Sequence, residues 1–116
     1  MMIEDEKFEQ YIFSDGKIVS MTCNFSDNSI ELRLQVRKKI GKQIFPCFVR
    51  LQFVGVVELD LLESFDAAGN YSDVVLVKVS ENHFYASFDP FGNSGEPNEN
   101  DNFVINSTSC TIDELL

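Results

Sequence analysis

The sequence has no tryptophan, one histidine and three prolines, and it has no long apolar run. A membrane-spanning helix needs about 20 predominantly apolar residues in succession, and no segment approaches that length. His83 has no serine or cysteine at a spacing typical of a catalytic site, so we expect it on the polar side of a strand. A glycine-rich phosphate loop, an HExxH motif and a dinucleotide fingerprint are all missing. We therefore expect a non-enzymatic protein without cofactor or metal.

Cysteine is scarce and odd in number. Cys23, Cys47 and Cys110 have no CxxC or Cys/His spacing, and each lies in a strand-like run where a free thiol behaves as a small buried apolar group. The acidic stretch 1–10 lacks the apolar run of a signal peptide. Since disulfides are rare in reducing compartments, these features predict a cytoplasmic protein with reduced thiols.

Basic residues are few, with 9 Lys and Arg against 19 Asp and Glu, and the net charge is −10. Such a charge repels phosphate backbones and anionic membranes, so we expect neither nucleic acid nor a membrane as a partner. It favours a basic protein surface, although the charge could serve solubility alone. Six of the nine cations lie in one region, which makes the rest of the chain more acidic than the total: Arg33, Arg37, Lys38, Lys39, Lys42 and Arg50.

Apolar residues make up 44% of the chain and come in short alternating runs, which favours strands over helices. The stretch Cys47–Leu61 is apolar at its odd positions, with Gly55 in its middle. A glycine inside a strand pattern marks a bulge or bend, so we expect the strand to bend or change sheet at Gly55. We expect 1–116 to form one domain with an aromatic core, because the chain has eleven phenylalanines.

The remaining pattern predicts a small antiparallel β-sandwich or open barrel of six to seven strands, with a short helix over Glu4–Phe13. One strand follows Lys17 and should bury Val19, Met21, Cys23 and Phe25. Val74–Ser80 is apolar on both faces and should be a central strand. Other expected features are a strand over 30–37, a brief helical turn over 64–68, a hairpin strand over 83–89, a last strand that ends at Cys110 and Ile112, and a frayed tail over 113–116.

The segment 90–102 has almost nothing to bury and predicts a solvent loop, the least ordered part of the chain. Its oxygen-bearing side chains do not have EF-hand spacing, so we predict no metal. With the acids of the central region, which include Glu63 and Asp66, the loop predicts a negative surface that binds a basic protein. The residues predicted to bind the partner are Glu58, Asp60, Asp89, Glu96, Glu99 and Asp101.

Two stretches resemble a family. Phe13–Ile18, FSDGKI, is similar to the F-H-D-x-x-V motif of small bacterial β-rich polymorphic-toxin immunity proteins. Val49–Leu59 is similar to their V-x-L-x-F-x-G-V-x-x-L core strand, and the resemblance extends from Phe13 to Ile112. Ser14 stands where the family pattern has histidine, so a role of that histidine does not carry over. The resemblance implies a non-enzymatic cytosolic protein that neutralises a toxin by binding it.

Two other interpretations stay open. The protein could be a structural, self-assembling subunit whose strand Val74–Val79 pairs between copies. It could also be a β-sandwich that binds a small molecule or calcium through the loop Asp89–Asp101. The identity of the partner, the strand order and the oligomeric state do not follow from the sequence.

Overall fold

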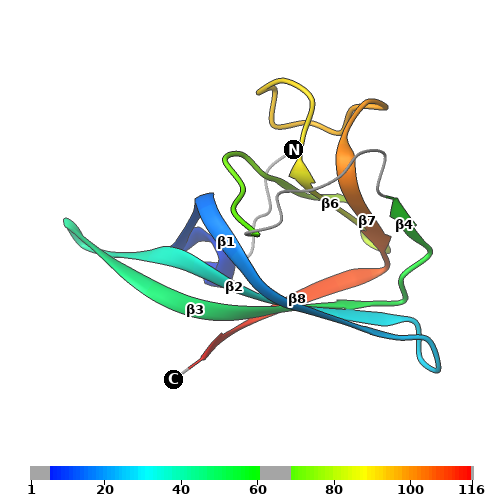
Figure 1. Cartoon of the computed structure of the whole chain (residues 1–116), viewed down its shortest axis with the longest axis horizontal. Coiled ribbons are helices and arrows are strands. Elements are labelled where there is room, and N and C mark those ends of the chain that lie inside the picture. The colour runs from blue at the N-terminus through cyan, green and yellow to red at the C-terminus, as the bar shows by residue number, and fades with distance from the viewer. Residues whose placement is uncertain (1–5, 61–68, 116) are drawn as a thin grey trace.

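The structure, a computed structural model, describes residues 6–60 and 69–115. It consists of two four-stranded antiparallel sheets, with one short helix before the first strand (Figure 1). In chain order the elements are α1 (Glu6–Glu9), β1 (Tyr11–Asn24), β2 (Ser29–Ile40), β3 (Gln43–Val54), β4 (Glu58–Asp60), β5 (Val75–Ser80), β6 (His83–Asp89), β7 (Asn102–Ser107) and β8 (Ser109–Leu115). The predicted mainly β class is therefore confirmed, with eight strands instead of six or seven.

Sheet A has the strand order β1-β2-β3-β8, and sheet B has the order β4-β7-β6-β5. Sheet A is the longer layer and extends beyond sheet B as the β2–β3 hairpin (Figure 1). The two sheets pack around one core to which the strand β2 contributes Leu32 and Leu34 and the strand β6 contributes Phe84 and Phe88. No helix in the described part of the chain has the length and apolar character needed to cross a membrane.

The core is aromatic, as the eleven phenylalanines predict. The rings of Phe53 in sheet A and Phe84 in sheet B meet edge to face, with centroids 6.1 Å apart. Phe88 meets Phe103 in the same way at 5.6 Å. Edge-to-face pairs are favoured because the positive ring edge meets the negative face of its neighbour. The contact between Phe53 and Phe84 joins the two sheets, and the contact between Phe88 and Phe103 packs two strands of sheet B against each other.

The chain changes sheet at two places that touch each other. Gly55 ends β3 of sheet A with φ 65°, and Thr108 lies between β7 of sheet B and β8 of sheet A. The Thr108 hydroxyl donates a hydrogen bond to the Val54 carbonyl oxygen at 2.8 Å. A Cβ atom at Gly55 would lie 2.4 Å from Thr108 Oγ1, so only glycine fits here. The expectation that the chain bends or changes sheet at Gly55 is confirmed.

Several local expectations are wrong. The helix ends at Glu9 and β1 begins at Tyr11, because Tyr11 and Ile12 pair with Lys38 and Arg37 of β2. Tertiary pairing thus overrides helical periodicity. The predicted C-terminal tail is instead part of β8, which pairs with β3 as far as Leu115. The helical turn predicted over 64–68 lies outside the described residues, as do Glu4, Asp5, Glu63, Asp66 and Leu116.

The first strand buries less than predicted. Val19 is 51% exposed, Met21 40% and Phe25 90%. The strand is outermost in sheet A and carries an irregularity in register around Val19, while Phe25 lies in the turn that follows. A bulge puts one residue out of alternation. Of the four predicted residues, Cys23 alone packs against the core while remaining partly exposed.

The strand β5 lies at the edge of sheet B and is hydrogen-bonded to β6 alone among the described strands, so its predicted central position is wrong. Its two apolar faces have another cause. Leu76 packs against the main core, whereas Val75 and Val77 join a second cluster with Tyr85 and Val104 on the opposite face of the sheet. Both faces of β5 are therefore packed against apolar side chains, although only one of its edges is hydrogen-bonded to another described strand.

Candidate functional site

The candidate site is the face of sheet B that points away from sheet A. Residues that pair across antiparallel strands share a face, and Glu58 pairs with Asn106 while Asp60 pairs with Val104. Val104 belongs to the second apolar cluster, opposite the main core. The alternation of β6 puts Asp89 on the same face, since Phe84, Ala86 and Phe88 point into the core.

The loop over 90–101 folds onto this face through a buried carboxylate. Asp101 is 2% exposed. Its Oδ2 accepts hydrogen bonds from the Tyr85 hydroxyl at 2.5 Å and from the Asn98 backbone N–H at 2.9 Å. Its Oδ1 accepts the Phe91 backbone N–H at 2.7 Å. One side chain therefore fixes both arms of the loop to the strand β6.

Asp101 was expected at the partner surface, and its burial corrects that expectation. The sequence predicts only that the loop has little to bury. A buried carboxylate is stable only when hydrogen bonds replace its lost hydration, and the loop backbone supplies two of the three donors. The loop is solvent-exposed over most of its length, as predicted, but Asp101 anchors it near its two ends, at Phe91 and at Asn98.

The other five predicted residues remain accessible. Glu58, Asp89, Glu96 and Glu99 are exposed and Asp60 is half-buried. We call these five residues the acidic surface. Lys78 is the only lysine or arginine in the chain after Arg50, so the part of the sequence that supplies these acids has an excess of negative charge. The structure thus brings residues from β4, β6 and the 90–101 loop to one side of sheet B.

An aromatic side chain stands out of the same loop. Phe91 is 61% exposed although its backbone is tied to Asp101. An exposed phenylalanine on a fixed backbone is typical of an anchor residue at a protein interface. Phe91 was not among the residues predicted to bind the partner. The available signal was an aromatic residue between proline and glycine, in a segment that has little else to bury.

Polar side chains also cross the outer face of sheet B in a row. His83 Nε2 lies 2.6 Å from Asn106 Oδ1, and the Asn106 side-chain amide donates to Glu58 Oε1 at 2.6 Å. His83 thus contacts an amide of the neighbouring strand, and the row fixes the position of Glu58. Burial and the hydrogen bond to Asp101 raise the pKa of Tyr85, so its hydroxyl remains a donor across the physiological range.

The described residues contain no group of three His, Cys, Asp or Glu side chains placed to hold a metal ion. Cys23, Cys47 and Cys110 are unpaired and partly buried. Burial raises the pKa of the Cys110 thiol, which keeps it in the unreactive protonated form.

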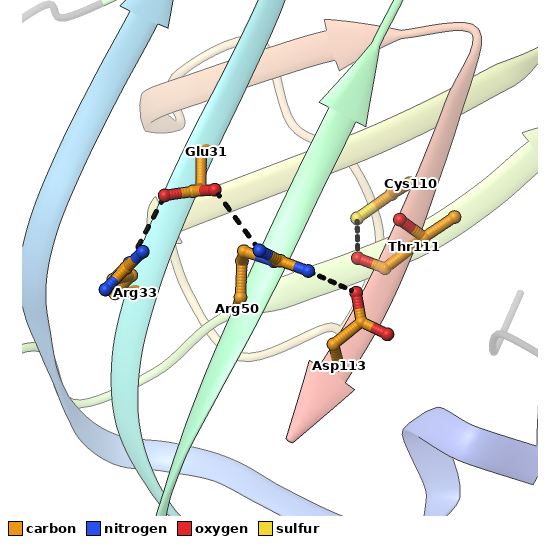
Figure 2. A network of polar contacts seen from close by, with 6 residues as sticks. All are labelled: Glu31, Arg33, Arg50, Cys110, Thr111 and Asp113. Carbon is orange, nitrogen blue, oxygen red and sulfur yellow. Dashed lines mark hydrogen bonds and ion pairs between the residues drawn. The ribbon is translucent and has the colours of Figure 1, made fainter. Parts of the chain in front are cut away.

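In sheet A the acidic side chains of the outer face form ion pairs with arginines of the same sheet. On its outer face Glu31 lies between Arg33 and Arg50, and Asp113 binds the other end of Arg50 (Figure 2). The closest of these contacts joins Arg50 Nη2 to Asp113 Oδ2 at 3.0 Å. Arg33 and Arg50 face each other across β2 and β3, so the carboxylates screen two like charges. These acids are not available to a partner.

Comparison of the chain with protein-family models, with curated proteins and with solved structures gives no match.

Proposed function

We propose that this protein is a non-enzymatic binding module that holds a basic protein partner on its acidic surface, with Phe91 as the apolar anchor. One observation supports the proposal most strongly: the buried Asp101 fixes a loop that exposes Phe91 together with the carboxylates of Glu96 and Glu99. A surface that is already ordered loses little conformational entropy when it binds. The loop geometry therefore supports a binding role for residues whose charge alone would also suit solubility.

The electrostatics support a basic partner. The part of the sequence that supplies the acidic surface, 58–99, contains Lys78 as its one lysine or arginine and therefore carries an excess of negative charge. Complementary charge speeds encounter and selects partners, while a desolvated aromatic group supplies much of the affinity. The surface offers both components within one loop and the strand β4 beside it.

The resemblance to immunity proteins supports a specific kind of partner and a specific role for the binding. In that role the partner is a basic toxin, the protein neutralises it by occupying its surface, and both act in the cytoplasm of a bacterium. The unpaired cysteines support the cytoplasmic part of this proposal, because exposed secreted thiols tend to oxidise. A toxin gene beside the gene for this protein would supply the partner for direct measurement.

The test is a pull-down from the source cell with immobilised protein and stepwise salt elution, followed by calorimetry with the retained protein. We expect one basic protein that elutes as salt rises. Phe91→Ala should weaken its binding at least about tenfold, the loss expected of an anchor residue. Phe25→Ala is the matched control, because Phe25 is 90% exposed but lies in the β1–β2 turn of sheet A.

Two results would contradict the proposal. If the eluate contains no retained protein, there is no basic partner to bind. If Phe91→Ala and Phe25→Ala weaken binding equally, Phe91 is not the anchor residue. Both variants change an exposed side chain, so their free energies of unfolding should stay within about 0.5 kcal/mol of the wild type. Urea denaturation checks that a loss of binding is not a loss of folding.

A further inference from the structure

The end of the β2–β3 hairpin is a second surface that the proposed function does not use. Pairing between β1 and β2 stops at Tyr11 and Lys38, and pairing between β3 and β8 stops at Phe48 and Leu115. Beyond these pairs β2 and β3 have only each other as strand neighbours among the described elements, and the hairpin projects from the body (Figure 1). We call the segment Arg37–Phe48 the basic hairpin.

The basic hairpin combines positive charge with exposed apolar area. No acidic residue occurs from Leu32 to Val57. Lys39 and Lys42 are exposed and form no ion pair with the described residues, whereas Lys38 is bound to Glu114. The exposed apolar side chains are Ile40 at 55%, Ile44 at 53%, Phe45 at 42% and Phe48 at 48%. The register of β2 with β3 puts Ile44 and Phe48 on one face of the hairpin and Ile40 and Phe45 on the other, so both faces of this projecting element expose apolar area that a partner can cover.

The backbone of the hairpin is protected against pairing with another strand. Pro46 lies in the part of β3 that extends past β8, and proline has no N–H to donate. This placement fits the rule that proline in a sheet lies at an edge. The contact that the hairpin makes must therefore use its side chains, and their charge calls for an acidic surface with apolar groups.

We infer that the basic hairpin of one copy binds the acidic surface of a second copy. The acidic surface offers complementary charge, and Phe91, which is 61% exposed, adds an apolar side chain from the same loop as Glu96 and Glu99. The contact cannot form within one molecule, because the hairpin lies at one end of sheet A while the 90–101 loop stands above sheet B (Figure 1). At physiological ionic strength screening acts over about 8 Å, so local complementarity outweighs the net charge of −10.

Such a contact is head-to-tail, because the two surfaces differ and each copy has one of each. Head-to-tail contacts form rings or open chains instead of closed two-fold dimers. A basic partner on the acidic surface would displace the hairpin of the neighbouring copy. The inference uses the acidic surface of the proposed function but does not require that partner, so purified protein alone can test it.

The experiment uses two charge-reversed variants and analytical ultracentrifugation at physiological ionic strength. One variant changes the hairpin, Lys39→Glu with Lys42→Glu, and the other changes the loop, Glu96→Lys with Glu99→Lys. The wild type should show a mass that rises with concentration and returns to the monomer near 1 M salt, where screening acts over about 3 Å. Each variant alone should associate at least about tenfold more weakly.

The mixture of the two variants gives the sharpest result. Each variant alone carries like charge on both surfaces, whereas in the mixture each surface of one variant meets a surface of opposite charge on the other, so equal amounts should recover the association that neither shows alone. Lys17→Glu is the control for a charge reversal on sheet A away from the hairpin, and it should leave association unchanged. A wild type that stays monomeric at physiological ionic strength overturns the inference and leaves the proposed function standing.

Two further results would also overturn it. Association that survives high salt and both variants would point to the edge of β5 instead. Binding of the monomeric wild type to vesicles of anionic lipid, lost with Lys39→Glu and Lys42→Glu, would assign the hairpin to a membrane surface. A loss of partner capture with self-association intact would instead count against the proposed function.

Discussion

The two sheets of this protein carry opposite excesses of charge. Sheet A with its hairpin turns has more basic than acidic side chains, since seven of the nine cations lie there: Lys17, Arg33, Arg37, Lys38, Lys39, Lys42 and Arg50. Sheet B and its connections have Lys78 alone against at least eight acids: Glu58, Asp60, Asp73, Glu81, Asp89, Glu96, Glu99 and Asp101. A net charge of −10 describes neither sheet.

The difference lies also in how each sheet holds its carboxylates. Sheet A pairs Glu31, Asp113 and Glu114 with cations at its surface. Sheet B buries one acid, Asp101, and leaves most of the others exposed. Exposed ion pairs contribute little to stability, whereas a buried and fully hydrogen-bonded carboxylate is costly to change. Sheet B should therefore be the more sensitive to loss of a carboxylate, although it has fewer ion pairs.

The largest expected effect is that of Asp101→Asn. Asparagine keeps one acceptor oxygen, so in either orientation its NH₂ group faces a backbone N–H that Asp101 now accepts, from Phe91 or from Asn98. A buried donor without an acceptor costs free energy. We expect the free energy of unfolding to fall by about 2 kcal/mol, measured by urea denaturation, with faster amide exchange at Phe91 and Asn98.

Glu99→Gln is the control for that measurement, because it removes an exposed carboxylate from the same loop. It should change stability by less than about 0.5 kcal/mol. If the two variants are equally stable, the loop does not depend on Asp101, and the anchor role of Phe91 loses its structural basis.

A smaller effect is expected in the ion pairs of sheet A. A double-mutant cycle with Arg50→Met and Asp113→Ala should give a coupling of about 0.5–1 kcal/mol that declines with salt. The side chains are 34% and 51% exposed, so water screens the pair. Among the described residues Arg50 Nε has no hydrogen-bond partner, which lowers the net gain further.

The matched cycle pairs Arg50 with Glu31, whose contact is longer at 3.8 Å. Its coupling should be smaller than that with Asp113, since attraction falls with distance. A coupling above about 2 kcal/mol in either cycle would lie in the range of buried pairs. It would contradict the expectation that sheet B is more sensitive than sheet A to the loss of a carboxylate.

The sequence predicts the class of fold because alternation of apolar residues reports which face of a strand is buried. It does this well for β2, where Leu32 and Leu34 are fully buried. It fails for β5, because burial of both faces gives the same pattern in a central strand and in an edge strand whose two faces both join apolar clusters. Apolar alternation therefore shows which face of a strand is buried, but it does not show whether the strand lies at the edge of its sheet.

The sequence predicts which acidic residues are candidates for the acidic surface, but it does not predict how the fold places them. Glu58 and Glu99 lie far apart in the chain, and the register of β4 with β7 and the anchored loop bring them to one face. Asp101 has the same composition signal as Glu99, yet Asp101 is buried. What separates them is the Tyr85 hydroxyl and two backbone donors, which only the folded chain brings together.

The smallest expected effect concerns Glu114, at the end of sheet A. Its Oε1 accepts hydrogen bonds from Lys38 Nζ at 2.8 Å and from the Tyr11 hydroxyl at 2.9 Å. The bond from Lys38 first, and that from Tyr11 second, lower the pKa of Glu114 below its ordinary value of 4.5. The folded state therefore favours the carboxylate, and this contribution to stability is present above pH 4.5 and is lost as the pH falls through the lowered pKa.

Glu114→Gln should remove this dependence. At pH 7 the variant should be slightly less stable than the wild type, and the two urea midpoints should converge as the pH falls well below 4.5. Glu99→Gln changes an exposed carboxylate of the 90–101 loop beside sheet B and should follow the wild type across the whole range. A gap between wild type and Glu114→Gln that widens toward low pH would reverse the sign expected for a carboxylate that the folded state stabilises, and it would assign the paired acids of sheet A a destabilising role.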